Sequence, residues 1–163
     1  MELAIISDTH LPRGTRALPE SCIERLRAAD LIIHAGDLSS MAVLEQLRGY
    51  GEVAAVHGNA DEADVRELLP ARLELELAGV TVIVTHNGGP RDGRLQRLHA
   101  RFPCAGAVIF GHSHIPLHES SAAAAFQIFN PGSATDKRRL PHHTMGILRA
   151  STEGLAFELV TLD

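Results

Sequence analysis

The sequence is poor in the features that mark membrane and secreted proteins. Its apolar stretches all fall far short of the length needed to cross a bilayer. Cysteine occurs only at Cys22 and Cys104, which excludes a disulfide framework and predicts two buried thiols in a reducing compartment. No targeting segment is recognisable, because Glu2 stands where a signal peptide carries positive charge and strand-like sequence begins at Leu3. We therefore expect a cytoplasmic protein without a membrane partner.

Excess positive charge is also absent, since the 163 residues carry a formal net charge of -5. This balance argues against a broad nucleic-acid-binding surface, although bound metal ions could still reverse the charge locally and attract a phosphate. The Gly-x-x-x-x-Gly-Lys loop of many ATPases is missing as well. With 45% hydrophobic residues and no repeat or long linker, the chain is expected to form a single domain over residues 1–163.

The first half of the chain predicts strands that alternate with helices. Short apolar runs at residues 3–6, 31–35 and 53–56 are typical of buried strands. Residues 20–29 and 41–47 have the spacing of amphipathic helices. Three strand–helix steps of this kind favour parallel strands joined by helical crossovers.

The second half predicts mostly strands. Leu73–Leu77 alternates strictly and indicates a half-exposed strand, which Gly79 turns into a second strand at 80–84. Residues 91–101 read as a helix and 107–110 as a buried strand. Further strands are expected around Leu117 and over residues 126–129, 144–149 and 155–162.

Potential ligands follow five of these apolar strands. Because ligands bind outside the carboxyl ends of strands in open α/β sheets, side chains at these positions can converge. Taken singly, an aspartate or asparagine of this kind is a turn residue and a lone histidine is structural, but five such clusters together favour a metal site. The clusters are Asp8-Thr9-His10, Gly36-Asp37, Gly58-Asn59-Ala60-Asp61, Thr85-His86-Asn87-Gly88 and Gly111-His112-Ser113-His114.

The residue types indicate which metals the site would hold. Oxygen and nitrogen donors together suit manganese, iron, zinc or nickel better than calcium, and we favour manganese. A carboxylate can bridge two such ions, and a pair of ions can clamp a phosphoryl group and activate a water molecule.

The order Asp-x-His, Gly-Asp, Gly-Asn, a single His and then Gly-His-x-His resembles the calcineurin-like metallophosphoesterases. The short length and the segment Asn130-Pro131-Gly132-Ser133 resemble the compact bacterial and archaeal phosphodiesterase branch. The resemblance implies an α/β fold of two packed mixed β-sheets flanked by helices, a four-layer α-β-β-α sandwich. It also implies a first metal ion on Asp8, His10 and His114, a second on Asn59, His86 and His112, and Asp37 as the bridge between them.

The sequence departs from the family pattern at the general acid. Many relatives have a histidine directly after the Gly-Asn asparagine, and here that position is Ala60, which has no proton to give. After His86, where relatives often show Gly-His, the chain reads Asn87-Gly88. Asp61 is expected to be a hydrogen-bond partner rather than the acid.

The resulting hypothesis is a metal-dependent phosphodiesterase with two divalent ions, in which Asp37 and Asn59 serve catalysis and the substrate is a small phosphate ester. The alternative is a non-catalytic scaffold for protein assembly, because a eukaryotic retromer subunit resembles the same branch. A DNA nuclease is disfavoured by the acidic charge. A homo-oligomer stays open.

Two further features of the sequence concern residues near these clusters. His34, within a strand that leads into Gly36-Asp37, is expected to support that turn. The basic run Lys137-Arg138-Arg139 could face a substrate phosphate, but a solvated loop is the preferred interpretation.

Overall fold

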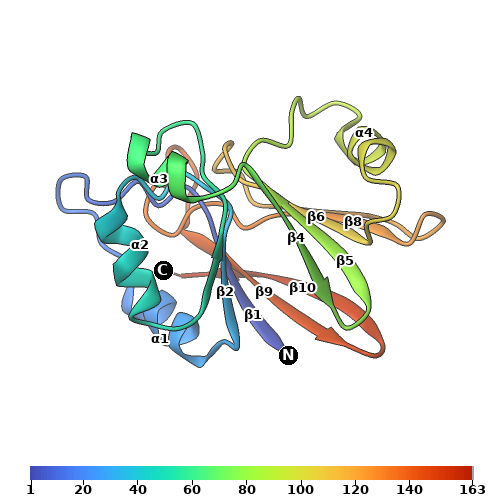
Figure 1. Cartoon of the computed structure of the whole chain (residues 1–163), viewed down its shortest axis with the longest axis horizontal. Helices are drawn as coiled ribbons and strands as arrows, with labels where there is room; N and C mark the ends of the chain where they lie inside the picture. Colours follow the sequence, from blue (N-terminus) through green and yellow to red (C-terminus); the bar gives the residue numbers. More distant parts are fainter. Residues whose placement is uncertain (163) are drawn as a thin grey trace.

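Two five-stranded sheets pack face to face in the computed structural model, which describes residues 1–162 (Figure 1). Asp163, the last residue of the predicted domain, lies outside the described residues. The elements are β1 (Glu2–Ile6), α1 (Glu20–Ala28), β2 (Leu31–His34), α2 (Met41–Arg48), β3 (Val53–Ala55), α3 (Ala63–Leu68), β4 (Arg72–Leu77), β5 (Val80–Thr85), α4 (Arg94–Arg101), β6 (Ala107–Ile109), β7 (Leu117–Ser121), β8 (Phe126–Asn130), β9 (Thr144–Ser151) and β10 (Gly154–Thr161).

The first sheet has the strand order β10-β9-β1-β2-β3. β1, β2 and β3 run parallel, whereas β9 and β10 are antiparallel to their neighbours. The second sheet has the order β4-β5-β6-β8-β7, with parallel β5, β6 and β8 between two antiparallel edge strands. Both sheets are therefore mixed: the parallel strands extend from the centre to one edge of the first sheet and occupy the centre of the second.

Three apolar layers hold these sheets and helices together. In β1, Ala4 and Ile6 face the layer beneath α1 and α2, while Leu3 and Ile5 face the second sheet. Burial on both faces explains why this strand reads as a continuous apolar run. The outer face of the second sheet packs against α4 through Leu98. Helices thus cover both outer faces (Figure 1), and the predicted α-β-β-α sandwich is confirmed.

Most predicted elements are present within a residue or two of their expected ends, with two differences. The helix expected from Arg91 begins at Arg94, because Gly93 before it adopts a left-handed conformation. The short helix α3 was not predicted.

Cys22 is buried as expected, and burial raises the pKa of its thiol to about 12. Cys104 is exposed instead, because it lies in the surface connection between α4 and β6.

Within residues 1–162, no helix combines the length and apolar character needed to cross a membrane.

The contact between the sheets predicts the effect of one substitution. The Phe129 ring of β8 fills the space beside Gly146 of β9, where an added Cβ would overlap the ring and lie 2.7 Å from its Cζ. We expect Gly146→Ala to lower the free energy of unfolding by about 1–3 kcal/mol, as overpacked cores do. Adding Phe129→Leu should recover part of this loss. Urea denaturation measures both effects.

Gly51→Ala serves as the control, because a Cβ there would meet only ordinary contacts, the nearest at 3.7 Å. If Gly146→Ala were as stable as the control, the sheet contact would not be as tight as described.

Candidate metal centre

The predicted site residues come from loops at the carboxyl ends of five strands. Asp8 follows β1, Asp37 follows β2, Asn59 follows β3, His86 follows β5 and His112 follows β6. Because the parallel strands of both sheets end on the same side of the molecule, these loops meet there. Backbone hydrogen bonds join them: Asp8 N donates to Gly36 O at 3.0 Å, and Gly111 N donates to His86 O at 2.9 Å.

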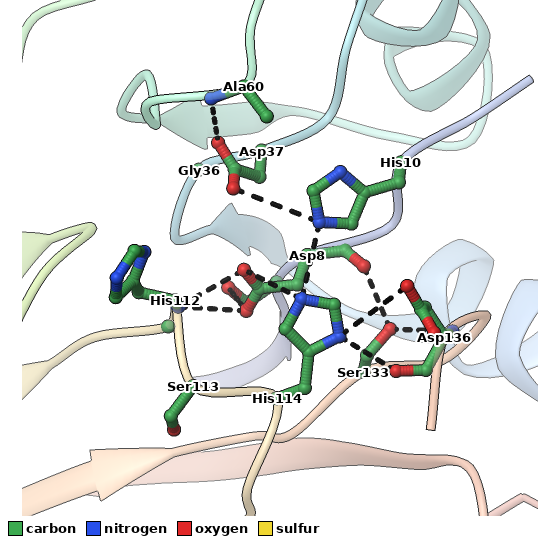
Figure 2. Close-up of polar contacts among 12 residues, drawn as sticks. Asp8, His10, Gly36, Asp37, Ala60, His112, Ser113, His114, Ser133 and Asp136 are labelled. Carbon is green, nitrogen blue, oxygen red and sulfur yellow. Dashed lines mark hydrogen bonds and ion pairs between the residues drawn. The ribbon is translucent and has the colours of Figure 1, made fainter. Parts of the chain in front are cut away.

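The first ligand group consists of Asp8, His10 and His114, all buried. One donor atom from each lies within 4.8 Å of the others. The Nε2 atoms of His10 and His114 are 3.2 Å apart, and Asp8 Oδ1 is 3.7 Å from His114 Nε2 (Figure 2). The carboxylate of Asp8 also accepts hydrogen bonds from the His112 amide and from Ser7 Oγ.

The second ligand group consists of Asp37, His86 and His112, with Asn59 beside it. The amide oxygen of Asn59 lies 3.1 Å from His86 Nε2 and 2.9 Å from His112 Nδ1. Asn59 and His112 are exposed, whereas Asp37 and His86 are buried. The centre is therefore open to solvent on the side of Asn59 and His112.

Asp37 connects the two groups through a single oxygen. Its Oδ2 lies 3.2 Å from His86 Nε2 in the second group and 3.8 Å from His10 Nε2 in the first. Its Oδ1 accepts a hydrogen bond from the Ala60 amide at 2.7 Å (Figure 2). All seven predicted residues thus lie around one point, and Asp37 occupies the position expected of a bridge.

The donor set fits divalent cations, because backbone carbonyls orient the rings of His86 and His114. His86 Nδ1–H donates to Ala35 O at 2.8 Å, and His114 Nδ1–H donates to Asp136 O at 2.7 Å. In the neutral form of each ring, these bonds leave the Nε2 lone pair directed into the centre, as is usual for metal-binding histidines. Two such nitrogens facing each other at 3.2 Å, as in His10 and His114, repel unless they share a cation or a proton.

For both carboxylates, burial raises the pKa, whereas hydrogen bonds and nearby histidines lower it. Burial raises the pKa of Asp8. Burial also disfavours the charged form of Asp37, but hydrogen bonds from His86 and the Ala60 amide outweigh it and lower the pKa to about 2. His86 is disfavoured as a cation by burial, yet its hydrogen bond to Asp37 raises its pKa. An ionised Asp37 therefore favours a cation beside it.

Two further residues hold the loop of Asp37. The expected support from His34 is present, because its Nδ1 accepts a hydrogen bond from Gly36 N at 3.1 Å and its Nε2 lies 3.0 Å from Thr9 Oγ1. Asp61 accepts from three backbone amides, those of Asp37 (3.1 Å), Ser39 (2.6 Å) and Gly58 (2.6 Å). Both of its oxygens are engaged, which agrees with a hydrogen-bonding role rather than an acid role.

The ligand loops are tightly folded. Asp8, His10, Asp37, His112 and His114 all have positive φ angles, between 46° and 70°. Non-glycine residues seldom adopt this region, and they cluster in it at functional sites. A Cβ on Gly58 would overlap Asp37 Oδ1, so that glycine is required for the close approach.

Several supporting residues escaped the sequence reasoning. Asn130 Nδ2 donates to Gly111 O at 2.9 Å, and Ser133 Oγ donates to Asp8 O at 2.8 Å. The segment Asn130-Pro131-Gly132-Ser133, noticed only for its resemblance, thus ties the loops of both sheets together. The signal was a polar segment that begins at Asn130, the last residue of the apolar strand β8.

The basic run 137–139 lies in a loop in which Arg138 and Arg139 are exposed, as the sequence predicts. The contact of Arg138 with the centre was not predicted: one of its guanidinium nitrogens lies 3.1 Å from His114 Nε2. Arg138 adopts a left-handed conformation, with φ of 50°.

Comparison with known proteins agrees with this geometry. Residues 1–153 match the model of the calcineurin-like phosphoesterase superfamily domain. A probable metallophosphoesterase of Methanothermobacter thermautotrophicus is 33% identical over 162 residues, which cover 98% of this chain and 92% of that protein.

Two solved structures have a similar fold. Vps29 of Entamoeba histolytica in complex with Zn²⁺ has a TM-score of 0.78 and 20% identity and covers both chains fully. A structure described as a novel archaeal phosphodiesterase has a TM-score of 0.73 and 24% identity, covering 99% of this chain and 100% of that one. At these identities the two structures establish the shared fold alone.

The burial of His34 predicts a pH dependence of stability. Burial lowers its pKa from 6.5 to about 4, so the folded protein holds the neutral ring. The unfolded chain binds a proton below about pH 6.5. Stability from this group is therefore complete above that pH and is lost as the pH falls toward 4, by roughly 3 kcal/mol in total. We expect His34→Gln to show a shallower decline between pH 6.5 and 4 in urea denaturation of chelator-treated protein.

His118→Gln is the control, since His118 is exposed. An identical decline in His34→Gln and the native protein would contradict the assignment of a neutral buried ring.

Proposed function

Because this chain belongs to the calcineurin-like phosphoesterase superfamily, we propose that it is a single-domain phosphodiesterase that uses two divalent metal ions, manganese in first place. The observation that carries the proposal is the position of Asp37 Oδ2 between the two ligand groups, 3.8 Å from His10 Nε2 and 3.2 Å from His86 Nε2. One carboxylate oxygen within reach of two sets of donors suits a bridging ligand.

The proposed ligands divide as the two groups do. Asp8, His10 and His114 would hold one ion, and Asn59, His86 and His112 would hold the other, with Asp37 shared. When bound, the ions would lower the pKa of a water molecule and neutralise charge on the phosphoryl group. The open side of the centre, at Asn59 and His112, is where a phosphate ester would enter.

The protein's own groups would position the substrate. The amide oxygen of Asn59 faces His86 and His112, so its NH₂ group is free to donate to a phosphate oxygen. Phosphoryl transfer depends mainly on such positioning and on charge stabilisation. Neither Ala60 nor Asp61 can donate a proton to the leaving group, because Ala60 has no acidic proton and Asp61 is buried with both oxygens engaged.

A non-catalytic scaffold is the second candidate, because the fold is also that of Vps29. The two candidates differ in turnover. A protein that binds metal but hydrolyses no phosphate diester with manganese, iron, zinc or nickel would favour the scaffold. Retention of all seven ligand types favours the enzyme.

The first test measures metal content and the effect of Asp37. Elemental analysis of protein purified without chelator should give two divalent ions per chain. Asp37→Asn should lower kcat/KM for bis(4-nitrophenyl) phosphate by about 10³-fold or more, because it removes the shared anionic ligand. His34→Gln, which alters only the support of that loop, should cost about 10- to 100-fold at most.

One ion per chain would refute the dinuclear assignment. Equal losses of kcat/KM in Asp37→Asn and His34→Gln would show that Asp37 is not the shared ligand.

The second test concerns the leaving group. General acid catalysis contributes about 10²–10⁴-fold and matters most for strongly basic leaving groups. We therefore expect the native protein to prefer aryl diesters with weakly basic leaving groups over alkyl esters, with a steep dependence of kcat/KM on leaving-group pKa. Ala60→His should flatten this dependence if the new ring reaches the leaving oxygen.

Ala60→Gln provides the matched control, because its side chain has similar reach and no titratable proton. A shallow dependence in the native protein would mean that another group already donates the proton.

A further inference from the structure

A pocket with cationic side chains adjoins the metal centre at His114. It has a volume of about 340 Å³ and lies between Ser113–Ile115 and residues 137–140. We call it the 137–140 pocket. The residues of its second wall belong to the connection between β8 and β9. Because His114 belongs to both the pocket lining and the first ligand group, one substituent of a phosphate ester bound at the centre can reach into the pocket.

Arg138 is the residue that links the pocket to the centre. Its guanidinium lies 3.1 Å from His114 Nε2, the atom that faces the ligand group. A cation on that atom would take the lone pair that now accepts from Arg138. The guanidinium would then turn its N–H groups to another acceptor within the same few ångströms, and its planar fork suits the two oxygens of a phosphate.

The charge of the pocket favours an anion. Lys137, Arg138 and Arg139 are consecutive in a chain whose net charge is -5. The acidic neighbour Asp136 is paired with an arginine, because its Oδ2 lies 3.2 Å from Arg16 Nη1 and farther, 3.8 Å, from His114 Nδ1. The aliphatic side chains of Ile115 and Leu140 complete the walls, which leaves room for an apolar spacer beside the anionic group.

We propose that the 137–140 pocket binds a second phosphate carried by one substituent of the ester, and that Arg138 is its main contact. The substrate class is then a phosphodiester with a phosphorylated substituent. This inference rests on the proposed phosphodiesterase function. The reaction itself is ordinary hydrolysis. The oxygen of water forms a new P–O bond and its protons pass to solvent, the P–O bond to the leaving group breaks and the leaving oxygen keeps the electron pair, and the second phosphate is unchanged.

Two probes that differ only in the second phosphate test the proposal. They are thymidine 5′-(4-nitrophenyl phosphate) and the same compound with a 3′-phosphate, which share the scissile bond and the 4-nitrophenolate leaving group. For the metal-loaded native protein we expect kcat/KM to be roughly 10- to 100-fold higher for the 3′-phosphorylated probe, as for one charge-assisted contact. Raised salt should reduce this ratio.

Variants locate the contact. Arg138→Gln should remove most of the ratio and Arg138→Lys should retain part of it, because lysine keeps the charge without the fork. Arg48→Gln, an exposed arginine on α2, should keep the native ratio. Calorimetry with thymidine 3′,5′-bisphosphate and thymidine 5′-monophosphate should show the same preference in binding, and its loss in Arg138→Gln.

The possible failures are distinguishable. A ratio near one in the native protein, or equal losses on both probes in Arg138→Gln, would overturn the pocket but leave the phosphodiesterase proposal standing. Hydrolysis of neither probe with any of the metals would overturn the proposed function. In that case an Arg138-dependent preference for the bisphosphate in calorimetry would still support the pocket, and no preference would refute it.

Discussion

Buried negative charge at the ends of two sheets is the constraint on which the rest of the structure depends. Asp8 and Asp37 are both almost inaccessible to solvent, and the charge of each raises the free energy of the other. Burial of a carboxylate is costly unless hydrogen bonds or cations accompany it. Here four imidazole rings surround the pair, and the hydrogen bond to Asp37 raises the pKa of His86, which favours positive charge beside that carboxylate. Divalent cations would satisfy the same demand with greater charge.

The backbone conformation follows from that demand. Directing Asp8, His10 and His114 toward one point requires left-handed residues, each of which costs of order 1 kcal/mol or more. Hydrogen bonds from outside the loops offset this cost. The carboxylate of Asp61 gathers three amides of the neighbouring loops, and Ser133 holds the carbonyl of Asp8. The ligand loops are therefore held rigid by residues that do not themselves face the centre.

Most of this fold was predictable because its strands are buried on both faces or alternate strictly, and both patterns are plain in the sequence. The convergence of the proposed ligands was predictable for a related reason, since parallel strands end on the same side of a sheet. The short helix α3 was not, because it buries only Val65 and has no side-chain cap. The contact of Arg138 with His114 and the exposure of Cys104 were also missed. Both depend on the local path of a loop, which residue type alone does not determine.

The segment from Asn130 to Arg138 supports the ligand loops and also carries the arginine proposed to bind a second phosphate. Asn130 and Ser133 fasten the ligand loops of the two sheets, and the carbonyl of Asp136 fixes the ring of His114. The next two residues bring the guanidinium of Arg138 to the same ring. A rearrangement of this loop cannot therefore alter the pocket without also disturbing a ligand of the centre. Because one continuous stretch of chain holds both the ring of His114 and the cationic wall of the pocket, a substrate bound as proposed would couple the pocket to the geometry of the first ligand group.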